Sequence, residues 1–464
     1  SRIVGSFTAR MAGEIMKRWL RLTVHYLPYA NYTLPPGDVV FPDNVVVSLC
    51  MMSGAANDKE PAIAADNDRM IEGWSRLTGG RPIRLWEYVC WPVDDTALPF
   101  QYPHVVKGFH QRHRQRVEGS YLNTGYYPPE IPSRDAMWAC QTPTLYCWFR
   151  TLWNPDFDVD AALAEYVGLM YGPARAPMGA ILSLLTDRWE QTRWKDPIEG
   201  HHVSPFQIHE ETMPRAEALR LKALLAEARG LAAEGTVFRR RVDFFGMAIE
   251  AFLKESDSYH EGGKNLPVLK VLKVGGNPVV DGVLDDACWR DVEPQFFKMG
   301  FDKVNTVPTN STTVQAVWTD SGITFAFRLT EPAVDKIRKG RTQRDQEIYA
   351  DDCIELFLDV EGQRKRACQI VANAIGTLYD RGADGTEWNA AGAKAAAHIG
   401  KDFWSLEVFL PFTDFPEKPK VAVGSKWYAN FTRSRYVGGW ELQRWSTLYR
   451  AGNRDFHAFG EVRF

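Results

Sequence analysis

Hydrophobic and polar positions change their spacing twice along this chain, and each change marks a predicted domain boundary. In residues 1–134, strand-like stretches rich in β-branched and aromatic residues alternate with helix-like stretches and Pro/Gly loops. Strands are expected at Leu20–Tyr29, Asn44–Met52, Ile83–Cys90 and Gly119–Thr124, with helices at 7–19, 66–78 and 104–117. This alternation is typical of a parallel α/β sheet, and four βα units are half of an eight-unit barrel. The pattern therefore predicts a partial (β/α)-barrel-like region.

From 135 to 262 the apolar positions follow a helical spacing. Leu163, Tyr166, Val167 and Met170 share one face with Val159, behind the acidic entry NPDFD. Similar stripes run through 178–189, 219–231 and 237–252. This segment is predicted to be a helical extension that packs on itself or on the barrel-like region.

Beyond the predicted linker EGGKNLPVLK at 261–270, apolar residues alternate with period two. The alternation recurs at 314–318, 323–329, 354–358 and 404–410, broken by the turns TDSG, GADG and VGG. Short strands of this kind predict an antiparallel β-sandwich over 263–464. The expected fold is α/β followed by all-β.

Composition excludes several classes of function. The 55 basic and 58 acidic side chains give a net charge of −3, which argues against a nucleic-acid partner. The basic cluster HQRHRQR at 110–116 is expected to be a solvated helix face. No apolar run reaches the roughly 18 to 20 residues needed to span a membrane. The 16 Trp and 17 Tyr supply flat apolar rings with a polar edge, which carbohydrate sites use.

Six motifs occur in order in the C-terminal segment. They are PVVDGVLDDACWRDVEP (278–294), AVWTDSGITFAFRL (316–329), DDCIELFLD (351–359), QIVANAIGTLYD (369–380), FWSLEVFLPFTDF (403–415) and WYANFTR (427–433). Together they resemble carbohydrate-binding module family 9. The resemblance implies a β-sandwich that binds an oligo- or polysaccharide between aromatic rings, with no required cofactor and with structural calcium in some members.

The N-terminal part resembles the region of glycoside hydrolase family 163, formerly a domain of unknown function. The matching text is YANYTLPPGDVVFPDNVVVSLC (29–50), IRLWEYV (83–89) and the segment from 143 to 178. That resemblance implies a (β/α)₈ barrel and endo-β-N-acetylglucosaminidase activity. The resemblance covers only the later part of the family's barrel region. The four strands expected here would therefore correspond to the fifth to eighth strands of the barrel, and the chain is expected to be an excerpt. Both resemblances together imply a secreted, periplasmic or cell-surface protein.

The barrel resemblance directs attention to side chains at strand ends, where barrel enzymes build their sites. Glu87 is the candidate catalytic carboxylate, either as acid/base or nucleophile, and its aromatic setting is expected to raise its pKa. The alternative for Glu87 is a structural ion pair with a nearby Arg. Further sugar-contacting candidates in this region are Tyr29, Tyr88, Trp91 and Asn123.

In the sandwich, Glu355 and Arg433 are expected to emerge from one open sheet face and to hydrogen-bond sugar hydroxyls, with an internal salt bridge as the alternative. Asn373 is an additional hydroxyl partner. Trp388, Trp440 and Trp445 lie in loop-like text and are the stacking candidates, whereas Trp289, Trp318 and Trp404 are expected in the core. Asp380 and Asp384, around Gly turns, are candidate ligands of Ca²⁺, with an ordinary polar turn as the alternative.

Two main hypotheses follow. In the first, the sandwich tethers the protein to a glycan while the barrel hydrolyses a glycosidic bond. In the second, the chain is a non-catalytic carbohydrate-binding protein or an inactive fragment, because half of a barrel is missing. A weaker third hypothesis makes the sandwich a haem-binding electron-transfer module, for which His398 and His457 give little support.

Overall fold

The computed structural model describes residues 1–51, 55–88, 96–122, 134–193, 205–300, 306–447 and 455–464, with the backbone alone at 134–140 and 384. The chain divides into two compact units, Ser1–Asp257 and Ser258–Phe464. The first unit therefore contains the sheet region together with most of the predicted helical extension. Each unit has its own hydrophobic core and is described separately.

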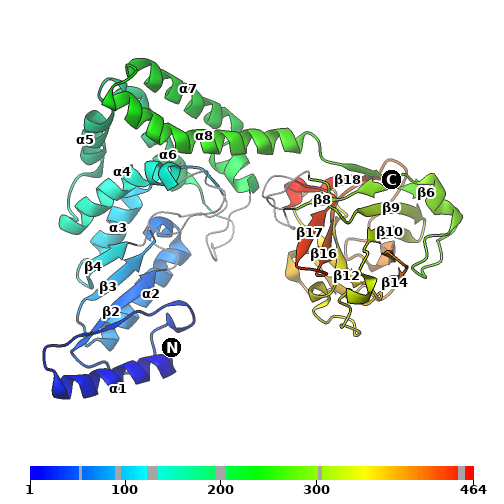
Figure 1. Cartoon of the computed structure of the whole chain (residues 1–464), viewed down its shortest axis with the longest axis horizontal. Helices are drawn as coiled ribbons and strands as arrows, with labels where there is room; N and C mark the ends of the chain where they lie inside the picture. The colour runs from blue at the N-terminus through cyan, green and yellow to red at the C-terminus, as the bar shows by residue number, and fades with distance from the viewer. Residues whose placement is uncertain (52–54, 89–95, 123–133, 194–204, 301–305, 448–454) are drawn as a thin grey trace. The chain divides into compact units, whose positions relative to one another are not determined.

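Within the described part of the N-terminal unit, a four-stranded parallel sheet has the order β1-β2-β3-β4. The strands are β1 (Val24–Tyr26), β2 (Val45–Met51), β3 (Ile83–Glu87) and β4 (Val117–Leu122). All four were predicted, and β2 matches its predicted range within one residue at each end. Figure 1 shows β2, β3 and β4 side by side.

The helices of this unit begin and end at recognisable signals. They are α1 (Arg2–Arg18), α2 (Pro61–Leu77), α3 (Pro103–His113), α4 (Arg134–Trp153), α5 (Val159–Tyr171), α6 (Arg175–Gln191), α7 (Arg215–Leu231) and α8 (Val237–Gly263). Pro occupies the first position of α2 and α3, where its missing N–H costs no hydrogen bond. Asp158 caps α5 by accepting a hydrogen bond from the Ala161 amide at 3.0 Å.

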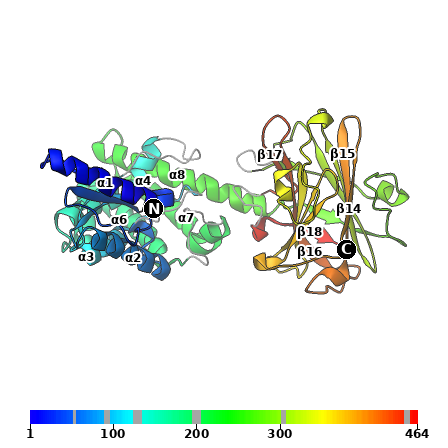
Figure 2. The same ribbon diagram turned by 90° about the horizontal axis from the view of Figure 1, so that it is seen from below.

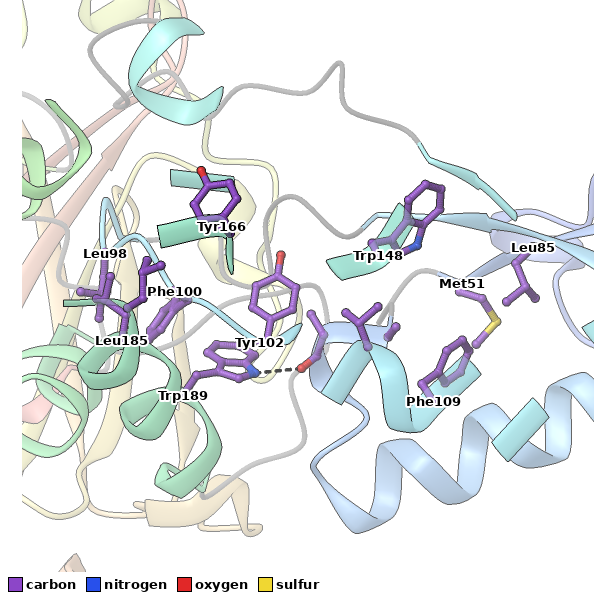
Figure 3. Close-up of a cluster of buried hydrophobic side chains, with 14 of the residues drawn as sticks. Met51, Leu85, Leu98, Phe100, Tyr102, Phe109, Trp148, Tyr166, Leu185 and Trp189 are labelled. Atoms are coloured by element: carbon purple, nitrogen blue, oxygen red, sulfur yellow. Dashed lines mark hydrogen bonds between the residues drawn. The ribbon is translucent and has the colours of Figure 1, made fainter. Parts of the chain in front are cut away.

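One face of the parallel sheet is buried against helices. Alternate strand residues such as Val47, Leu49 and Leu85 join a continuous core with Trp74 of α2 and Phe109 of α3. The same core continues into the helical segment, as Figure 3 shows for ten labelled side chains. The dashed line there is the hydrogen bond from Trp189 Nε1 to the Ala56 carbonyl, 3.0 Å long.

The opposite face of this sheet is not closed into a barrel by the described residues. β1 and β4 are its edges, and the sheet stays open. Ser48, Arg84, Trp86 and Tyr121 line a shallow hollow of about 620 Å³ on this face. The predicted βα units are present, but the barrel that the resemblance implies is not observed.

The C-terminal unit is a sandwich of two sheets, which Figure 2 shows as separate layers. In the smaller sheet the order is β14-β15-β10-β9-β6, with β7 beside β9; in the larger it is β13-β12-β11-β16-β17-β8, with β18 between β16 and β5. The strands are β5 (Val268–Lys270), β6 (Leu272–Lys273), β7 (Gln295–Phe296), β8 (Lys298–Met299), β9 (Thr312–Thr319), β10 (Gly322–Thr330), β11 (Cys353–Asp359), β12 (Cys368–Asn373), β13 (Leu378–Arg381), β14 (Lys394–Ile399), β15 (Phe403–Pro411), β16 (Lys426–Arg435), β17 (Glu441–Arg444) and β18 (Gly460–Arg463).

The prediction of an all-antiparallel sandwich is wrong at two places. β18 pairs with β5 in parallel, and β6 pairs with β9 in parallel. Both exceptions involve the short strands β5 and β6 that follow the predicted linker. These strands are only three and two residues long and lack a long alternating pattern, so their direction could not be predicted from the spacing of apolar residues.

The core of the sandwich lies between the two sheets. It contains the alternating residues of β9, β10, β11, β15 and β16 that the period-two pattern placed on one face. Trp289, Trp318 and Trp404 are buried, as predicted. Trp445 was expected in a loop, but it is buried in this core against Phe431, with ring centroids 5.1 Å apart. Of the described helices, none is long and apolar enough to span a membrane.

Candidate functional site

The outer face of the larger sheet, turned away from the core, carries polar side chains on adjacent strands. Glu355 of β11 lies opposite Thr432 of β16, and Thr432 lies opposite Arg444 of β17. On the other side of β11, Gln369 of β12 occupies the same face. These four residues alternate with core residues of the same strands, which is why their side chains lie on the side of the sheet away from the core. They are nevertheless covered, with exposed fractions of 7% for Glu355, 8% for Gln369, 0% for Thr432 and 1% for Arg444. We call them the polar row.

The polar row is internally connected. Gln369 Nε2 donates to Glu355 Oε2 at 2.7 Å, and Thr432 Oγ1 donates to Glu355 Oε1 at 3.3 Å. Burial lowers the pKa of Arg444 to about 10, against the opposing charges of Asp455 and Glu355. The guanidinium is still charged at neutral pH. The Glu355 carboxylate and the Arg444 guanidinium therefore lie on one face, with the Thr432 hydroxyl between them and the Gln369 amide beside Glu355.

Exposed aromatic rings lie at the margins of this face. The short 3₁₀ helix η8 (Ile348–Ala350) carries Tyr349, which is 43% exposed. Its ring meets Tyr379 of β13 edge-on, with centroids 6.2 Å apart. Trp440, between β16 and β17, is 57% exposed. Flat exposed rings next to hydrogen-bonding groups are the arrangement that sugar rings stack on.

Arg433 does not share this face with Glu355, which corrects the sequence expectation. It lies opposite Ile354, on the side of β16 that faces the core. Its guanidinium donates to the Thr330 carbonyl at 3.0 Å and to Thr312 Oγ1 at 3.1 Å, both on the smaller sheet. Arg433 is 1% exposed and ties the two sheets together, and burial lowers its pKa to about 10. The alternative of an internal structural role fits this residue.

Asn373 is also structural. Its amide nitrogen donates to the Arg341 carbonyl at 2.8 Å and to Asp351 at 3.1 Å. Its side-chain oxygen accepts from the amides of Ile375 at 3.2 Å and Thr377 at 2.9 Å. An amide side chain offers two donors and two acceptor positions, and all four are used here. These bonds give Asn373 a structural role, and its contact with a sugar stays a prediction.

Trp388 lies at the edge of the larger sheet and is partly buried. Its indole nitrogen donates to the Asp414 carbonyl at 2.8 Å, and its ring stacks on Phe415 with centroids 5.6 Å apart. Trp388 also lines a hollow of about 540 Å³ together with Tyr379 and Arg381. The structure thus gives this residue a fixed ring beside a cavity.

The carboxylate of Asp380 is occupied by other partners. It forms an ion pair with Arg344 through one oxygen and accepts from the Ala390 amide at 2.9 Å through the other. Calcium binding at Asp380 stays a prediction. The side chain of Asp384 lies outside the described residues. In the part of the chain that the structure describes, no group of three or more His, Cys, Asp or Glu is arranged to hold a metal ion.

In the N-terminal unit, Glu87 is buried in the core on the helix side of the sheet. It follows Ile83 and Leu85 in the same alternation, and its exposed fraction is 0%. His110 Nε2 of α3 lies 3.2 Å and 3.1 Å from its two oxygens. Trp148 Nε1 of α4 donates at 3.3 Å, and Ser120 Oγ of β4 donates to the same oxygen.

These partners decide the ionisation of Glu87. Burial by itself would raise the pKa of this carboxyl, but the charge and hydrogen bond of His110, with those of Ser120 and Trp148, outweigh burial and lower it. The sequence analysis expected a raised pKa suited to a general acid, and that expectation is wrong. The alternative of a structural ion pair is observed, with His110 in place of an arginine.

Of the remaining candidates of this unit, the structure describes Tyr29 and Tyr88. Tyr29 lies three residues beyond the end of β1 and is 39% exposed. The Cys50 thiol donates to the Tyr88 hydroxyl at 3.8 Å, and Cys50 faces away from the helix side of β2. Trp91 and Asn123 lie outside the described residues.

Comparisons with known proteins give a family match in the N-terminal part of the chain. Residues 1–181 match the family described as Domain of unknown function (DUF4838). Among curated proteins, none matches the chain.

Solved structures resemble the C-terminal part. One is a carbohydrate-binding module of family 9 from Caldicellulosiruptor kristjanssonii in complex with cellotriose, 15% identical, which matches over 42% of this chain and 93% of its own length with a TM-score of 0.34. Another is a putative carbohydrate-binding protein from Bacteroides uniformis ATCC 8492, 18% identical, over 43% of this chain and 100% of its own with a TM-score of 0.35.

Sequence reasoning missed two residues of this face, Arg444 and Tyr349. Arg444 reaches Glu355 only through the register of β11, β16 and β17, and that register joins segments far apart in sequence. Tyr349 lies two residues before Asp351, the first residue of the motif DDCIELFLD. Its position in a loop just before a predicted strand was the available signal.

Proposed function

We propose that the C-terminal unit binds carbohydrate on the outer face of its larger sheet. The observation that carries the proposal is the polar row of Gln369, Glu355, Thr432 and Arg444. Sugar hydroxyls donate and accept hydrogen bonds in adjacent positions, and a carboxylate next to a guanidinium supplies both kinds of partner. The six sequence motifs that resemble carbohydrate-binding module family 9 support the same proposal.

The charges of the row favour a neutral sugar. Glu355 and Arg444 contribute one negative and one positive charge on the same face. An anionic ligand drawn to Arg444 would be repelled by Glu355, and a cationic ligand drawn to Glu355 would be repelled by Arg444. A neutral saccharide meets no such repulsion, and its apolar ring faces have Tyr349 and Trp440 at the margins to stack on.

The proposal assigns binding and leaves out bond cleavage. Glu87 has no exposed surface, and its carboxylate is shared among His110, Ser120 and Trp148. A residue that protonates or attacks a glycosidic bond must reach the reacting atoms. The second of the two sequence hypotheses, a non-catalytic carbohydrate-binding protein, is therefore the one that we carry forward.

A glycan array tests the proposal with the full chain. We expect binding to neutral glycans with dissociation constants between millimolar and micromolar, about −4 to −8 kcal/mol. Trp440→Ala is expected to weaken binding about five- to tenfold, as loss of one stacked ring does. Trp153→Ala is the matched control, because Trp153 is a 93% exposed tryptophan of the other unit. Absence of any sugar ligand, or equal losses in both variants, would contradict the proposal.

A further inference from the structure

A cavity of about 440 Å³ is lined by residues of α3, α5 and α6 in the N-terminal unit. Small-molecule sites usually measure about 300–1,000 Å³, so the cavity has the size of a ligand site. Leu163 and Val167 of α5 and Leu182 of α6 give it an apolar lining. Of these, Val167 and Leu182 are buried. The proposed sugar binding concerns the other unit and involves none of these residues.

Helices α5 and α6 run in opposite directions along this cavity. His104, near the start of α3, contacts Asp160 near the start of α5 at 2.9 Å and Glu190 near the end of α6 at 3.1 Å. At the other end of the cavity, a Cβ on Gly179 would lie 3.8 Å from a methyl group of Val167. The start of α5 is therefore next to the end of α6, and the end of α5 is next to the start of α6.

The two ends of the cavity differ in charge. Asp160, Asp187 and His104 line the end where α6 finishes, whereas Arg175 lines the end where α6 begins. Even when His104 is protonated, the two carboxylates leave the first end negative. Arg175 and Asp187 are exposed, and within the described residues neither side chain has a hydrogen bond or an ion pair. Both charges are thus available to a ligand.

A buried hydroxyl in this cavity lacks a partner. Thr186 of α6 lines the cavity and is 4% exposed, but its Oγ1 forms no hydrogen bond with any residue that the structure describes. Buried polar groups are nearly always paired, and an unpaired one costs free energy. A polar ligand in the cavity would supply the missing partner. Ser183, about one turn earlier on α6, presents a second and exposed hydroxyl to the same space.

The order of these groups matches an extended ligand with two charged ends. Arg175 and Asp187 are twelve positions apart on α6, which is about 18 Å at a rise of 1.5 Å per residue. The ligand spans less than this distance, because both side chains line the cavity. A tripeptide or tetrapeptide in an extended conformation is roughly 10–14 Å long. Its ammonium group can pair with Asp187, its carboxylate with Arg175, and its amide groups with the Thr186 hydroxyl.

We propose that this cavity binds a short apolar peptide with free termini. The peptide lies along α6 with its amino end at Asp187 and its carboxyl end at Arg175. Its backbone forms a hydrogen bond with Thr186, and its side chains contact the apolar lining of the cavity. Such a ligand differs chemically from a neutral sugar, so the proposal is independent of carbohydrate binding by the C-terminal unit.

Calorimetry on the full chain tests the proposal with trileucine, N-acetyl-trileucine and trileucine amide. We expect trileucine to bind with a dissociation constant of about 0.1–1 mM. The acetylated and the amidated peptide each lack one terminal charge and should bind about two- to fivefold more weakly, as for loss of an exposed ion pair. A dissociation constant of trileucine above about 10 mM, or equal binding of all three peptides, would overturn the proposal.

Two substitutions test the orientation of the peptide. Asp187→Asn should remove the difference between trileucine and its acetylated form, and Arg175→Gln should remove the difference between trileucine and its amide. The matched controls are Glu227→Gln on α7 and Arg76→Gln on α2, which are exposed positions outside the cavity and should keep both differences. Retention of the differences in Asp187→Asn and Arg175→Gln, or loss of the difference at the opposite terminus, would contradict the proposal.

Thr186→Val separates contact with the ligand from a structural role, because valine has nearly the same shape and lacks the hydroxyl. Removal of an unpaired buried hydroxyl should leave the unfolding temperature unchanged or raise it. The affinity for trileucine should nevertheless fall about two- to tenfold, as for a lost hydrogen bond. Unchanged affinity would refute the contact that the proposal requires. Sugar binding belongs to the other unit and should not change in this variant, so failure of either proposal leaves the other intact.

Discussion

Replacing Glu87 by Gln is expected to destabilise the N-terminal unit without affecting sugar binding. The change keeps the shape of the side chain and an oxygen that accepts from Trp148 and Ser120, but it removes the charge that faces His110. Breaking one partner of a buried ion pair costs about 3–5 kcal/mol. Because the glutamine would still accept hydrogen bonds from Ser120 and Trp148, we expect a smaller loss, of about 2–4 kcal/mol.

The stabilisation by Glu87 also depends on pH. Its pKa in the folded protein is lowered, so the carboxylate contributes stability at neutral pH, and that contribution falls as the pH drops below about 5. As the pH falls from 5 to 3, the free energy of unfolding should decrease less in Glu87→Gln than in the wild type. The difference between the two proteins therefore narrows in acid.

Hydrogen exchange of the full chain measures this effect within one unit. Peptides that cover β3 and α3 should exchange faster in Glu87→Gln, whereas peptides of the sandwich should not change. Glu118→Gln is the matched control, since Glu118 on β4 forms a half-exposed ion pair with Arg84 and such pairs contribute about 0–1 kcal/mol. A double-mutant cycle with His110→Gln should give a coupling of roughly 1–3 kcal/mol. Unchanged protection in Glu87→Gln, or a coupling near zero, would refute the buried ion pair.

Two further predictions concern the sandwich. Arg433→Met should lower the free energy of unfolding of this unit by about 2–4 kcal/mol in urea denaturation, because the guanidinium links the two sheets. Sugar affinity should be unchanged, because Arg433 lies away from the polar row. A specific loss of affinity in a stable variant would contradict that placement. Gly282→Ala should destabilise the same unit by at least about 1 kcal/mol, since Gly282 has a φ of +85° and a Cβ would lie 2.5 Å from the Ala397 backbone. An unchanged unfolding temperature would show that this turn tolerates a side chain.

The spacing of apolar residues predicted most of the helices and strands. It did not predict which polar side chains of these elements are buried and which partners they bind. β2 and α5 are found where the patterns put them, because their apolar positions alternate or recur cleanly. The same alternation also decides which face Arg433 occupies, and our prediction placed it on the wrong face. Ala429, Phe431 and Arg433 share one face, so the burial of Phe431 already places Arg433 on the core side.

Other features of the site depend on contacts between distant segments. Glu87 alternates with Ile83 and Leu85, which places it on the buried side, but His110 reaches it from a helix that follows a separate loop. The four hydrogen bonds of Asn373 include one to Arg341, 32 residues earlier. Arg444 and Glu355 share a sheet face only through the register of the intervening strand β16. None of these pairings follows from local periodicity, because register between strands and helices is set by the packing of the whole unit.

The most direct test of carbohydrate binding by the polar row is a calorimetric titration of Glu355→Gln with the sugar identified on the array. The change retains an oxygen for Gln369 and Thr432, so the sheet should keep its structure. Glu293→Gln, at an exposed glutamate of the same unit, is the charge-matched control. We predict at least a tenfold loss of affinity in Glu355→Gln, as for a lost charged hydrogen bond, and no loss in Glu293→Gln. Equal affinity in both variants would contradict binding at this face.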